Sequence, residues 1–261
     1  MPSKTKVLSK VSKILYCFSP EEPVWTATAL SKKIDIPVTT LHGILADLVA
    51  LNFLEQDHHS KLYRIGLRFM EMGEQFTNNF ELNNIAHGVM RELTTDVETL
   101  VGLSILYKSW MYVSMSTVPL KITNSFRYVG PKMPAYNSAG GKMILAFLSA
   151  EQQRNYLSIA EKDSLLPFDF DKDEFLQELA TIRKQRYAFL WNNGKRDTPF
   201  SIAAPIFGRE RQILASLVVI SPYKGFDPGK VPFITQSVTN SAQQISVRCG
   251  HLSSGFGVDL G

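Results

Sequence analysis

Hydrophobic residues in the first fifth of the chain recur at helical spacing. The clearest case follows Pro37, where the apolar positions have the i, i+3, i+4, i+7 pattern of one buried stripe: Leu41, Ile44, Leu45 and Leu48. The same spacing predicts a helix over residues 5–18, and a shorter helix begins at the cap candidate Thr26. Thr39 is placed to cap the third helix, which we expect to end near Leu51.

The pattern changes to that of short strands after the third helix. Two runs, FLEQD and KLYRIG, contain residues that favour strands and are separated by the polar stretch HHS. Three helices followed by a small β-hairpin are the winged form of the helix-turn-helix, a motif that reads DNA with its last helix. We therefore expect a winged helix-turn-helix domain over residues 1–66.

The remaining pattern predicts a connecting helix and a second domain. Residues 67–80 are helical and polar, and their few apolar side chains would make a subunit contact if the helix lies outside either core. From residue 81 to 250, helical stretches are interspersed with apolar strands, which indicates one α+β or α/β sensing domain. Residues 251–261 form a C-terminal tail. The fold class expected for the whole chain is α+β.

Composition narrows the class of protein modestly. With 261 residues, 44% of them hydrophobic, the chain is long enough for two domains. A formal charge of +4 permits a polyanionic partner without requiring one. Cys17 and Cys249 lie far apart and match no zinc-binding pattern, so we expect reduced thiols in a cytoplasmic protein. No signal peptide is recognisable, and no apolar run approaches the ~18 residues of a membrane helix, so we expect no membrane partner.

The polar side of the third helix is the candidate DNA-reading surface. A recognition helix in the major groove needs short hydrogen-bonding side chains near its N-terminus. Thr39 and Thr40 suit phosphate contacts, while Thr40 and His42 can reach base edges. The other candidates for DNA contact lie in the second helix and the wing: Thr26, Lys32, Lys33, Lys61 and Arg64. An ordinary three-helix core, or a winged helix that binds protein, would show the same pattern.

The stretch YNSAGGKMILA places small residues at the start of a later helix. A Walker phosphate loop would need a glycine where Tyr136 stands and Ser or Thr where Met143 stands, so that motif is excluded. The free N–H groups of Ala139, Gly140 and Gly141 can instead hold a small anion or carboxylate. A tight strand-to-helix turn without a ligand is the alternative.

No set of residues indicates catalysis. The five histidines show no HExxH or comparable metal-ligand spacing, and no G-x-S-x-G motif occurs. Cys17 lies in an apolar helix, which disfavours a reactive thiolate. We therefore expect no catalytic residue, no metal site and no cofactor, although an enzyme acting on a small acid stays a minor alternative.

Several blocks of sequence, in this order and spacing, resemble the IclR family of transcriptional regulators: IPVTTLHGILADLVALNFLE, YRIGLRFMEMG, RYVGPKMPAYNSAGGKMILA, IRKQRYAF, SIAAPIF and ASLVVIS. The resemblance implies an N-terminal winged helix-turn-helix, a connecting helix and a C-terminal GAF-like effector domain. It also implies a homodimer or a dimer of dimers that binds a palindromic operator. Such a repressor or activator would respond to a small carbonyl or carboxylate effector.

The reading helix departs from the pattern of the family at one position. The family usually has an arginine after the residue that matches His42, where this chain has Gly43. The change removes a bidentate donor worth about 1–3 kcal/mol. It also weakens the helix by about 1 kcal/mol relative to alanine. A degenerate regulator, which binds protein or binds DNA weakly and has an empty effector pocket, is therefore the alternative function.

The effector pocket implied by the resemblance also departs from the family. Family members commonly bind the ligand with backbone amides that match Ala139 and Gly140, and add polar or acidic side chains from later segments. The matching positions of this chain are Leu190, Trp191, Asn192, Asn193, Ser201, Val218 and Ile220. Because most of them are apolar or uncharged, we expect a drier pocket that favours an aromatic or otherwise apolar carboxylate.

Overall fold

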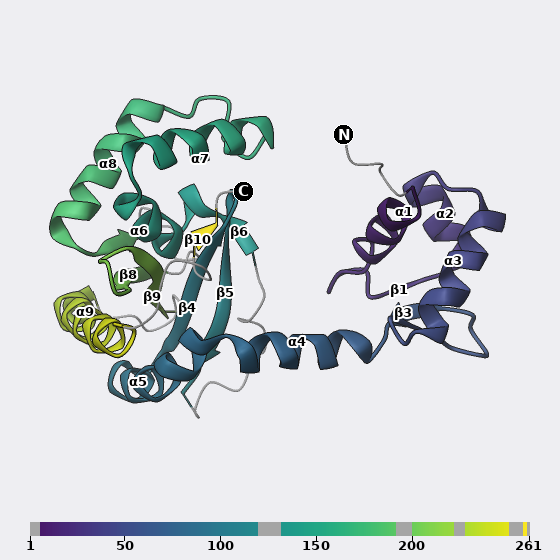
Figure 1. Ribbon diagram of the computed structural model, residues 1–261, viewed down its shortest axis with the longest axis horizontal. Helices are drawn as coiled ribbons and strands as arrows, with labels where there is room; N and C mark the ends of the chain where they lie inside the picture. The colour runs from purple at the N-terminus through teal and green to yellow at the C-terminus, as the bar shows by residue number, and fades with distance from the viewer. Residues whose placement is uncertain (1–5, 120–131, 192–199, 222–227, 251–257, 260–261) are drawn as a thin grey trace. The chain divides into compact units, whose positions relative to one another are not determined.

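The computed structural model describes residues 6–119, 132–191, 200–221, 228–250 and 258–259 of the chain (Figure 1). The chain divides into two compact units, Met1–Phe76 and Thr77–Gly261. This boundary falls inside the predicted connecting segment of residues 67–80. Of the predicted tail, residues 251–257 and 260–261 lie outside the described residues.

The first unit has the predicted winged helix-turn-helix fold. Its elements in chain order are α1 (Lys6–Leu15), β1 (Val24–Trp25), α2 (Ala27–Ile34), α3 (Val38–Ala50), β2 (Leu54–Gln56) and β3 (Tyr63–Ile65). The strands form an antiparallel sheet in the order β1-β3-β2. The predicted stripe of α3 is fully buried, in a core that also contains Ile14, Leu30, Leu54 and Tyr63. The two-residue β1 was not predicted from the sequence.

Helix boundaries in this unit follow the capping chemistry with one exception. The Thr26 hydroxyl accepts a hydrogen bond from the Ala29 amide at 3.2 Å, so Thr26 caps α2 as predicted. The prediction that Thr39 caps α3 is wrong, because the helix begins at Val38. Pro37 is extended at ψ 136° and its carbonyl accepts from the Leu41 amide at 3.0 Å, so Pro37 is the half-helical residue and Thr39 is already inside the first turn.

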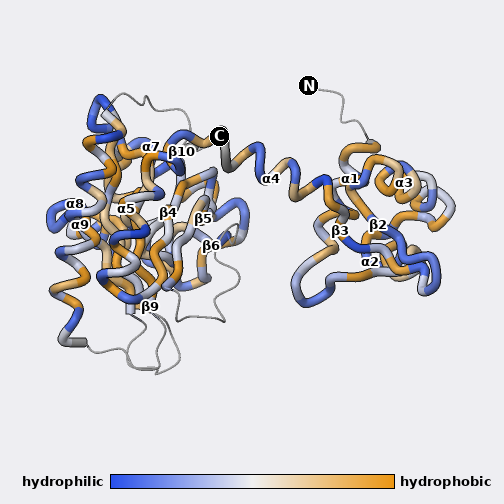
Figure 2. The backbone as a smooth tube through the Cα atoms, turned by 90° about the horizontal axis from the view of Figure 1, so that it is seen from below, coloured by the Kyte–Doolittle hydropathy of each residue, from blue (hydrophilic) through white to orange (hydrophobic). Residues whose placement is uncertain are grey.

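Residues 68–97 form two consecutive helices, α4 (Arg68–Asn79) and α5 (Glu81–Val97). The tube of α4 alternates between hydrophilic and hydrophobic residues (Figure 2). Four large apolar side chains at or before α4 are exposed: Leu67 is 61%, Met70 69%, Met72 50% and Phe76 56% accessible. The helix predicted for residues 67–80 is therefore present, and it carries exposed apolar surface.

The second unit is built on a curled, mostly antiparallel sheet. Within the described residues its strand order is β6-β5-β4-β9-β8-β7, and β10 pairs in parallel with the end of β4. The strands are β4 (Leu100–Tyr107), β5 (Trp110–Thr117), β6 (Lys132–Pro134), β7 (Ala188–Leu190), β8 (Phe200–Phe207), β9 (Ile213–Ser221) and β10 (Val258–Asp259).

Helices cover both faces of this sheet (Figure 1). They are α5, α6 (Ala139–Phe147), α7 (Ala150–Lys162), α8 (Lys172–Gln185) and α9 (Val231–Arg248), with short 3₁₀ turns at Ala135–Asn137 and Pro228–Lys230. One core lies between the sheet and α5 with α9, and the other lies beneath α6, α7 and α8. Side chains of alternate residues along each strand therefore enter different cores. This alternation determines which side chains face α6.

A buried polar contact fastens α5 to the sheet. The register of β4 and β5 shifts between Leu103 and Ser104, and Ser114 is left without an opposite residue. The Ser114 hydroxyl donates to Asn83 Oδ1 of α5 at 2.9 Å, and Asn83 Nδ2 donates to the Ser114 carbonyl at 3.4 Å. Asn83 therefore satisfies the carbonyl that the bulge removes from the strand ladder.

Candidate DNA-reading surface and effector site

The outer surface of α3 is arranged as a reading helix requires. Leu41, Ile44, Leu45 and Leu48 are buried, whereas Thr39, Thr40, His42 and Gly43 are exposed. Thr39 and Thr40 occupy the first turn, where helix N–H groups attract phosphate. A Cβ added to Gly43 would meet no atom within 4 Å. The polar side predicted from the sequence is thus open, and no neighbouring element of this unit explains the glycine.

A short turn fixes α3 relative to α2. Asp35 adopts a left-handed conformation at φ 53°, and its amide donates to the Ser31 carbonyl. The Ser31 hydroxyl donates to the Ile36 carbonyl at 2.6 Å, and the Ile36 amide donates back to the Ser31 carbonyl at 3.2 Å. Ser31 therefore closes the turn of the helix-turn-helix from both sides.

Two of the four cations predicted to contact DNA have partners within the unit. Lys33 Nζ lies 3.8 Å from Glu22 and 5.7 Å from the centre of the Trp25 ring. Arg64 lies opposite Glu55 in the β2–β3 ladder, and its guanidinium binds that carboxylate at 2.7 and 2.9 Å. Such exposed pairs are weak and are screened by salt, so a phosphate can compete for either cation. Lys32 and Lys61 are exposed and form no ion pair with a described residue.

The wing turn is organised by a carboxylate. Asp57 Oδ1 accepts hydrogen bonds from the Ser60 amide, the Ser60 hydroxyl and the His59 amide at 2.6, 2.7 and 3.1 Å. These donors, Ser60 foremost, hold the pKa of Asp57 below its usual range. Lys61 follows in a left-handed conformation at φ 58°. The wing tip thus presents a defined turn with exposed Lys61 beside it.

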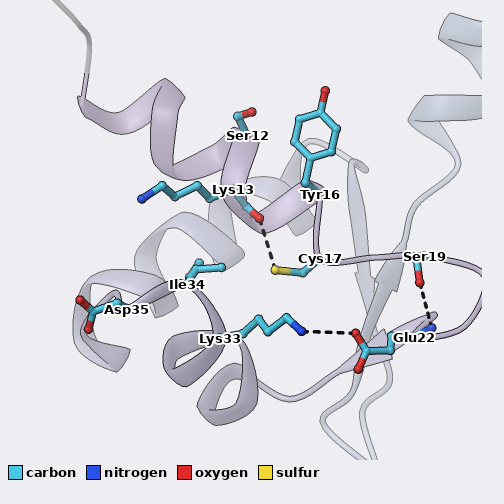
Figure 3. Close-up of a pocket in the computed structure, with 9 residues that line it drawn as sticks. All are labelled: Ser12, Lys13, Tyr16, Cys17, Ser19, Glu22, Lys33, Ile34 and Asp35. Carbon is cyan, nitrogen blue, oxygen red and sulfur yellow. Dashed lines mark hydrogen bonds and ion pairs between the residues drawn. The ribbon is translucent and has the colours of Figure 1, made fainter. Parts of the chain in front are cut away.

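A hollow of about 620 Å³ lies between the ends of α1 and α2 (Figure 3). It is lined by Ser12, Lys13, Tyr16, Cys17, Ser19, Glu22, Lys33, Ile34 and Asp35. The Cys17 thiol donates to the Lys13 carbonyl at 3.3 Å, and partial burial raises the pKa of this thiol. Cys17 lies after α1, which ends at Leu15, so the prediction that it lies in a helix is wrong.

In the second unit, the start of α6 is enclosed. Ser138 caps the helix by accepting from the Gly141 amide at 2.9 Å. A Cβ on Gly141 would lie 2.2 Å from the Ala135 carbonyl oxygen, and one on Gly140 would lie 2.8 Å from Ser104 Oγ. Both glycines are therefore required by close packing. The Tyr156 hydroxyl, buried beneath the preceding turn, accepts from the Tyr136 amide at 2.8 Å and holds that turn in place.

Of the three amides predicted to hold an anion, that of Gly141 is already used by Ser138, so this part of the prediction is wrong, whereas those of Ala139 and Gly140 remain available as donors. No described residue accepts a hydrogen bond from the Ala139 or Gly140 amide, as is usual at a helix N-terminus. The Ser216 hydroxyl donates to the Gly140 carbonyl at 2.9 Å, whereas Ser104 Oγ, also fully buried, has no partner among the described residues. Unpaired donors together with the N-terminal dipole favour an anion at this place.

Four side chains predicted for the effector pocket lie on the face of the sheet that is covered by α6. Leu190, Ser201 and Ile220 form one row across β7, β8 and β9. Ala203 and Val218 form the next row, which reaches Gly102 of β4. These rows give a mostly apolar floor. Leu190, Ser201, Val218 and Ile220 thus share a face of the sheet.

Sequence reasoning missed Gly102, Val113 and Ala203. A Cβ on Gly102 would lie 3.2 Å from Val218 Cγ1 and 3.5 Å from Val113 Cγ1. The glycine therefore leaves no side chain between these two valines on this face of the sheet. The strand pattern VGLSIL, with small residues at alternate positions, was the signal that could have identified Gly102 and Ser104.

Trp191 is not brought together with the floor. Its ring lies 6.5 Å from that of Phe189, which lies 6.2 Å from Phe200 in the core beneath α5 and α9. Trp191 therefore lies near the opposite face of the sheet from Leu190. Asn192 and Asn193, which follow it, lie outside the described residues. Among the described residues, no cluster of potential metal ligands occurs and no helix is long and apolar enough to span a membrane.

Taken together, these two units define a class of protein, the transcriptional regulator with a helix-turn-helix domain and an effector domain. Comparison with known proteins agrees. The model for the IclR helix-turn-helix domain matches residues 7–58, and the model described as bacterial transcriptional regulator IclR C-terminal matches residues 74–247. The chain belongs to the IclR family of transcriptional regulators, whose characterised members are not enzymes.

Individual relatives agree with this assignment. The HTH-type transcriptional regulator KipR of Bacillus subtilis is 27% identical over 252 residues, which cover 96% of this chain and 100% of the relative. The Thermotoga maritima IclR structure is 21% identical with a TM-score of 0.72, covering 94% of this chain and 99% of that chain. An IclR homologue from Microbacterium hydrocarbonoxydans complexed with 4-hydroxybenzoate is 19% identical with a TM-score of 0.76, covering 94% and 100%.

Proposed function

We propose that this regulator binds a palindromic operator and that a small aromatic or otherwise apolar carboxylate modulates its operator affinity. The proposal of an effector rests on one observation, namely that donor amides and an apolar surface lie together. The donor amides of Ala139 and Gly140 begin a helix that covers the apolar floor around Val218 and Ile220. A carboxylate head would accept from the amides, and an apolar body would be buried against the floor.

Support for the ligand class comes from the composition of the floor. Ser201 is the one hydroxyl among the predicted floor residues, and no charged side chain of a described residue joins it in these rows. A short hydroxy or keto acid would leave most of this surface without a matching partner, whereas an aromatic ring would bury it. The homologue crystallised with 4-hydroxybenzoate makes this acid the natural first probe.

The DNA half of the proposal rests on α3. Thr39, Thr40 and His42 would contact phosphate and base edges, with Thr26, Lys32, Lys33, Lys61 and Arg64 on the flanking backbone. Two copies of the chain are needed to read a palindrome, and the exposed apolar residues of the α4 segment would be covered in such a homodimer or dimer of dimers. Effector binding would change the relative placement of two reading helices, and with it the match to half-sites about one DNA turn apart.

Calorimetry with a panel of aromatic and short aliphatic acids tests the effector half. We expect binding of 4-hydroxybenzoate or another aromatic acid, and weaker binding when Val218→Asp places a charge on the floor. Exposed Val247→Asp is the matched control, because that residue lies on α9 and is 76% accessible. Binding of short hydroxy or keto acids alone would contradict the apolar-pocket proposal.

A second candidate function is a regulator that binds protein or binds DNA weakly. Gly43 favours it, because the usual arginine is missing from an otherwise open reading surface. A mobility shift on the upstream region of the gene, repeated over a range of salt concentrations, separates the two. A sequence-specific complex supports the operator proposal, and complexes that form equally on all duplexes support the second candidate.

A further inference from the structure

Five exposed cations gather at one end of the second unit, outside the predicted effector site. Arg183 and Lys184 lie in the last turn of α8, and Arg186 is its C-cap residue. Arg209 and Arg211 lie in the turn between β8 and β9. We call this group the α8–hairpin patch. The hairpin carries one acid, Glu210. Within the described residues, no carboxylate forms an ion pair with any of the five cations.

Stacking on two phenylalanines brings the two parts of the patch together. The Arg186 guanidinium lies 5.2 Å from the centre of the Phe207 ring and 5.8 Å from that of Phe147. Arg183 lies 5.7 Å from the same Phe147 ring, and the two rings pack edge to face at 4.9 Å. Phe207 is the last residue of β8, so the hairpin arginines follow it within four residues. A stacked guanidinium is oriented in advance and keeps donors for an external partner.

This patch accounts for the whole net charge of the chain. Setting aside its five cations and Glu210 leaves 23 basic and 23 acidic residues, from the 28 and 24 in the sequence. By contrast, residues 1–66 contain 8 Lys or Arg and 6 Asp or Glu. The patch with Glu210 therefore carries a net charge of +4, whereas residues 67–261 as a whole, with 20 Lys or Arg and 18 Asp or Glu, carry the same net charge of +2 as residues 1–66.

Helix stabilisation explains only part of the patch. Cations in the last turn of a helix interact favourably with its dipole, which accounts for Arg183, Lys184 and Arg186. Arg209 and Arg211 belong to a hairpin, where no helix end needs them. The Gly208 amide donates to the Gln212 carbonyl at 2.9 Å, the Arg211 amide donates to the Gly208 carbonyl at 3.1 Å, and the Glu210 amide donates to Gln212 Oε1 at 2.8 Å. None of these contacts uses the side chain of Arg209 or Arg211.

We infer that the α8–hairpin patch is a second, sequence-independent contact for the phosphate backbone of duplex DNA. Four of its five cations are arginines, whose planar fork fits phosphate oxygens. A duplex held by the winged helix is also the polyanion at the highest local concentration. This inference rests on the proposed binding of DNA by the first unit, and it adds a surface on the second. Such a contact would strengthen binding without changing which bases are read.

The test compares two double variants of the full-length chain. Arg209→Gln with Arg211→Asn removes the hairpin charges, and asparagine is chosen because residue 211 has φ 57° and asparagine tolerates the left-handed region. The matched control, Arg154→Gln with Lys162→Gln, removes two exposed cations from α7 of the same unit. Both variants lower the net charge equally, so a difference in their duplex binding shows that the position of the removed charges matters. Thermal midpoints establish that each is folded.

Fluorescence anisotropy on a 40-base-pair duplex of arbitrary sequence, from low to high salt, gives the slope of log K against log salt. For the hairpin variant we expect this slope to become shallower by roughly 0.9 for each phosphate that is no longer neutralised, with several-fold weaker binding at low salt. The α7 control should keep the slope of the unmodified chain. Equal slopes for all three proteins, or an equal change in both variants, would overturn the inference.

Two further outcomes are distinguishable. If sedimentation shows that the hairpin variant loses an oligomer while the salt slope is unchanged, the patch binds an acidic surface of a second copy, and the DNA inference is wrong. If the unmodified chain binds no duplex at any salt concentration, the proposed function fails together with the inference. If only the inference about the patch is wrong, the winged helix still prefers particular DNA sequences. Selection of bound sequences with the Thr40→Ala variant tests that preference separately.

Discussion

Helices α3 and α6 each contain glycine within their first two turns, and the surroundings of those glycines are opposite. A Cβ at Gly43 of α3 would have no atom within 4 Å, whereas a Cβ at Gly141 of α6 would lie 2.2 Å from a carbonyl oxygen. One helix lacks a side-chain cap and presents its first turn outward, and the other is capped by Ser138 and buried. The glycine of α6 is therefore required by the fold. At Gly43 the packing does not require a glycine, so we expect the residue at this position to matter chiefly for binding an external partner.

The largest effect expected from this difference is at Gly141. Gly141→Ala forces a methyl group against the Ala135 backbone and Ser138 Oγ, which should lower the free energy of unfolding of the second unit by about 3 kcal/mol. Denaturant unfolding followed by circular dichroism measures this effect. A change below about 0.5 kcal/mol, the range of ordinary surface substitutions, would show that the start of α6 is not tightly packed.

The reading surface of α3 should respond in the opposite way. Replacing both Thr40 and His42 by alanine removes exposed donors, so duplex affinity should fall by about 1–3 kcal/mol for each base that is no longer bound. Stability should change by no more than about 0.5 kcal/mol. Operator titration and thermal unfolding of the same double variant measure the two quantities. Unchanged affinity would move the reading surface away from α3.

Gly43 offers a smaller, stabilising change. Gly43→Ala should raise the free energy of unfolding of the first unit by about 1 kcal/mol, because alanine favours the helix and its Cβ meets no neighbour. Gly43→Arg should keep much of this gain and also strengthen DNA binding. Urea unfolding and duplex titration test the pair. If both substitutions destabilise, Gly43 has a structural role that its open surroundings do not reveal.

The smallest expected effect is on the pH dependence of stability, which should differ between the wing turn and the start of α6. The wing turn depends on the Asp57 carboxylate, whose pKa is lowered by Ser60, whereas the start of α6 depends on the Ser138 hydroxyl. A lowered pKa means that the contribution of Asp57 to stability is complete above its unfolded pKa of about 4 and is lost as pH falls through the folded pKa. Asp57→Asn should therefore flatten the acid limb of unfolding of the first unit. An identical acid limb in the variant would exclude Asp57 as its source.

Local patterns determined how far each region could be predicted. The stripe of Leu41, Ile44, Leu45 and Leu48 is a property of consecutive residues, and the structure confirms both the helix and its buried side. The start of α3 was misplaced because the extended backbone of Pro37 sets it, rather than the side chain of Thr39. The DNA and effector contacts themselves stay predictions, since they involve molecules outside the chain.

Features that depend on strand register escaped the sequence. The pairing of Arg64 with Glu55 follows from their opposite positions in β2 and β3, nine residues apart. Trp191 and Leu190 are neighbours in sequence, and only the pairing of β7 with β8 shows that Leu190 shares a face with Ser201 while Trp191 lies near Phe189. The α8–hairpin patch likewise needs the fold, because Arg186 and Arg211 are far apart along the chain.

Selection of bound sequences from a random duplex pool tests the central claim most directly, because it asks whether the outer side of α3 reads DNA. With the full-length chain, we expect an enriched inverted repeat whose half-sites lie about 10 base pairs apart, centre to centre, or a multiple of that distance. The Thr40→Ala and His42→Ala variants should alter the preferred bases within each half-site. A pool without enrichment, or an enriched sequence that both variants still select, would contradict the account.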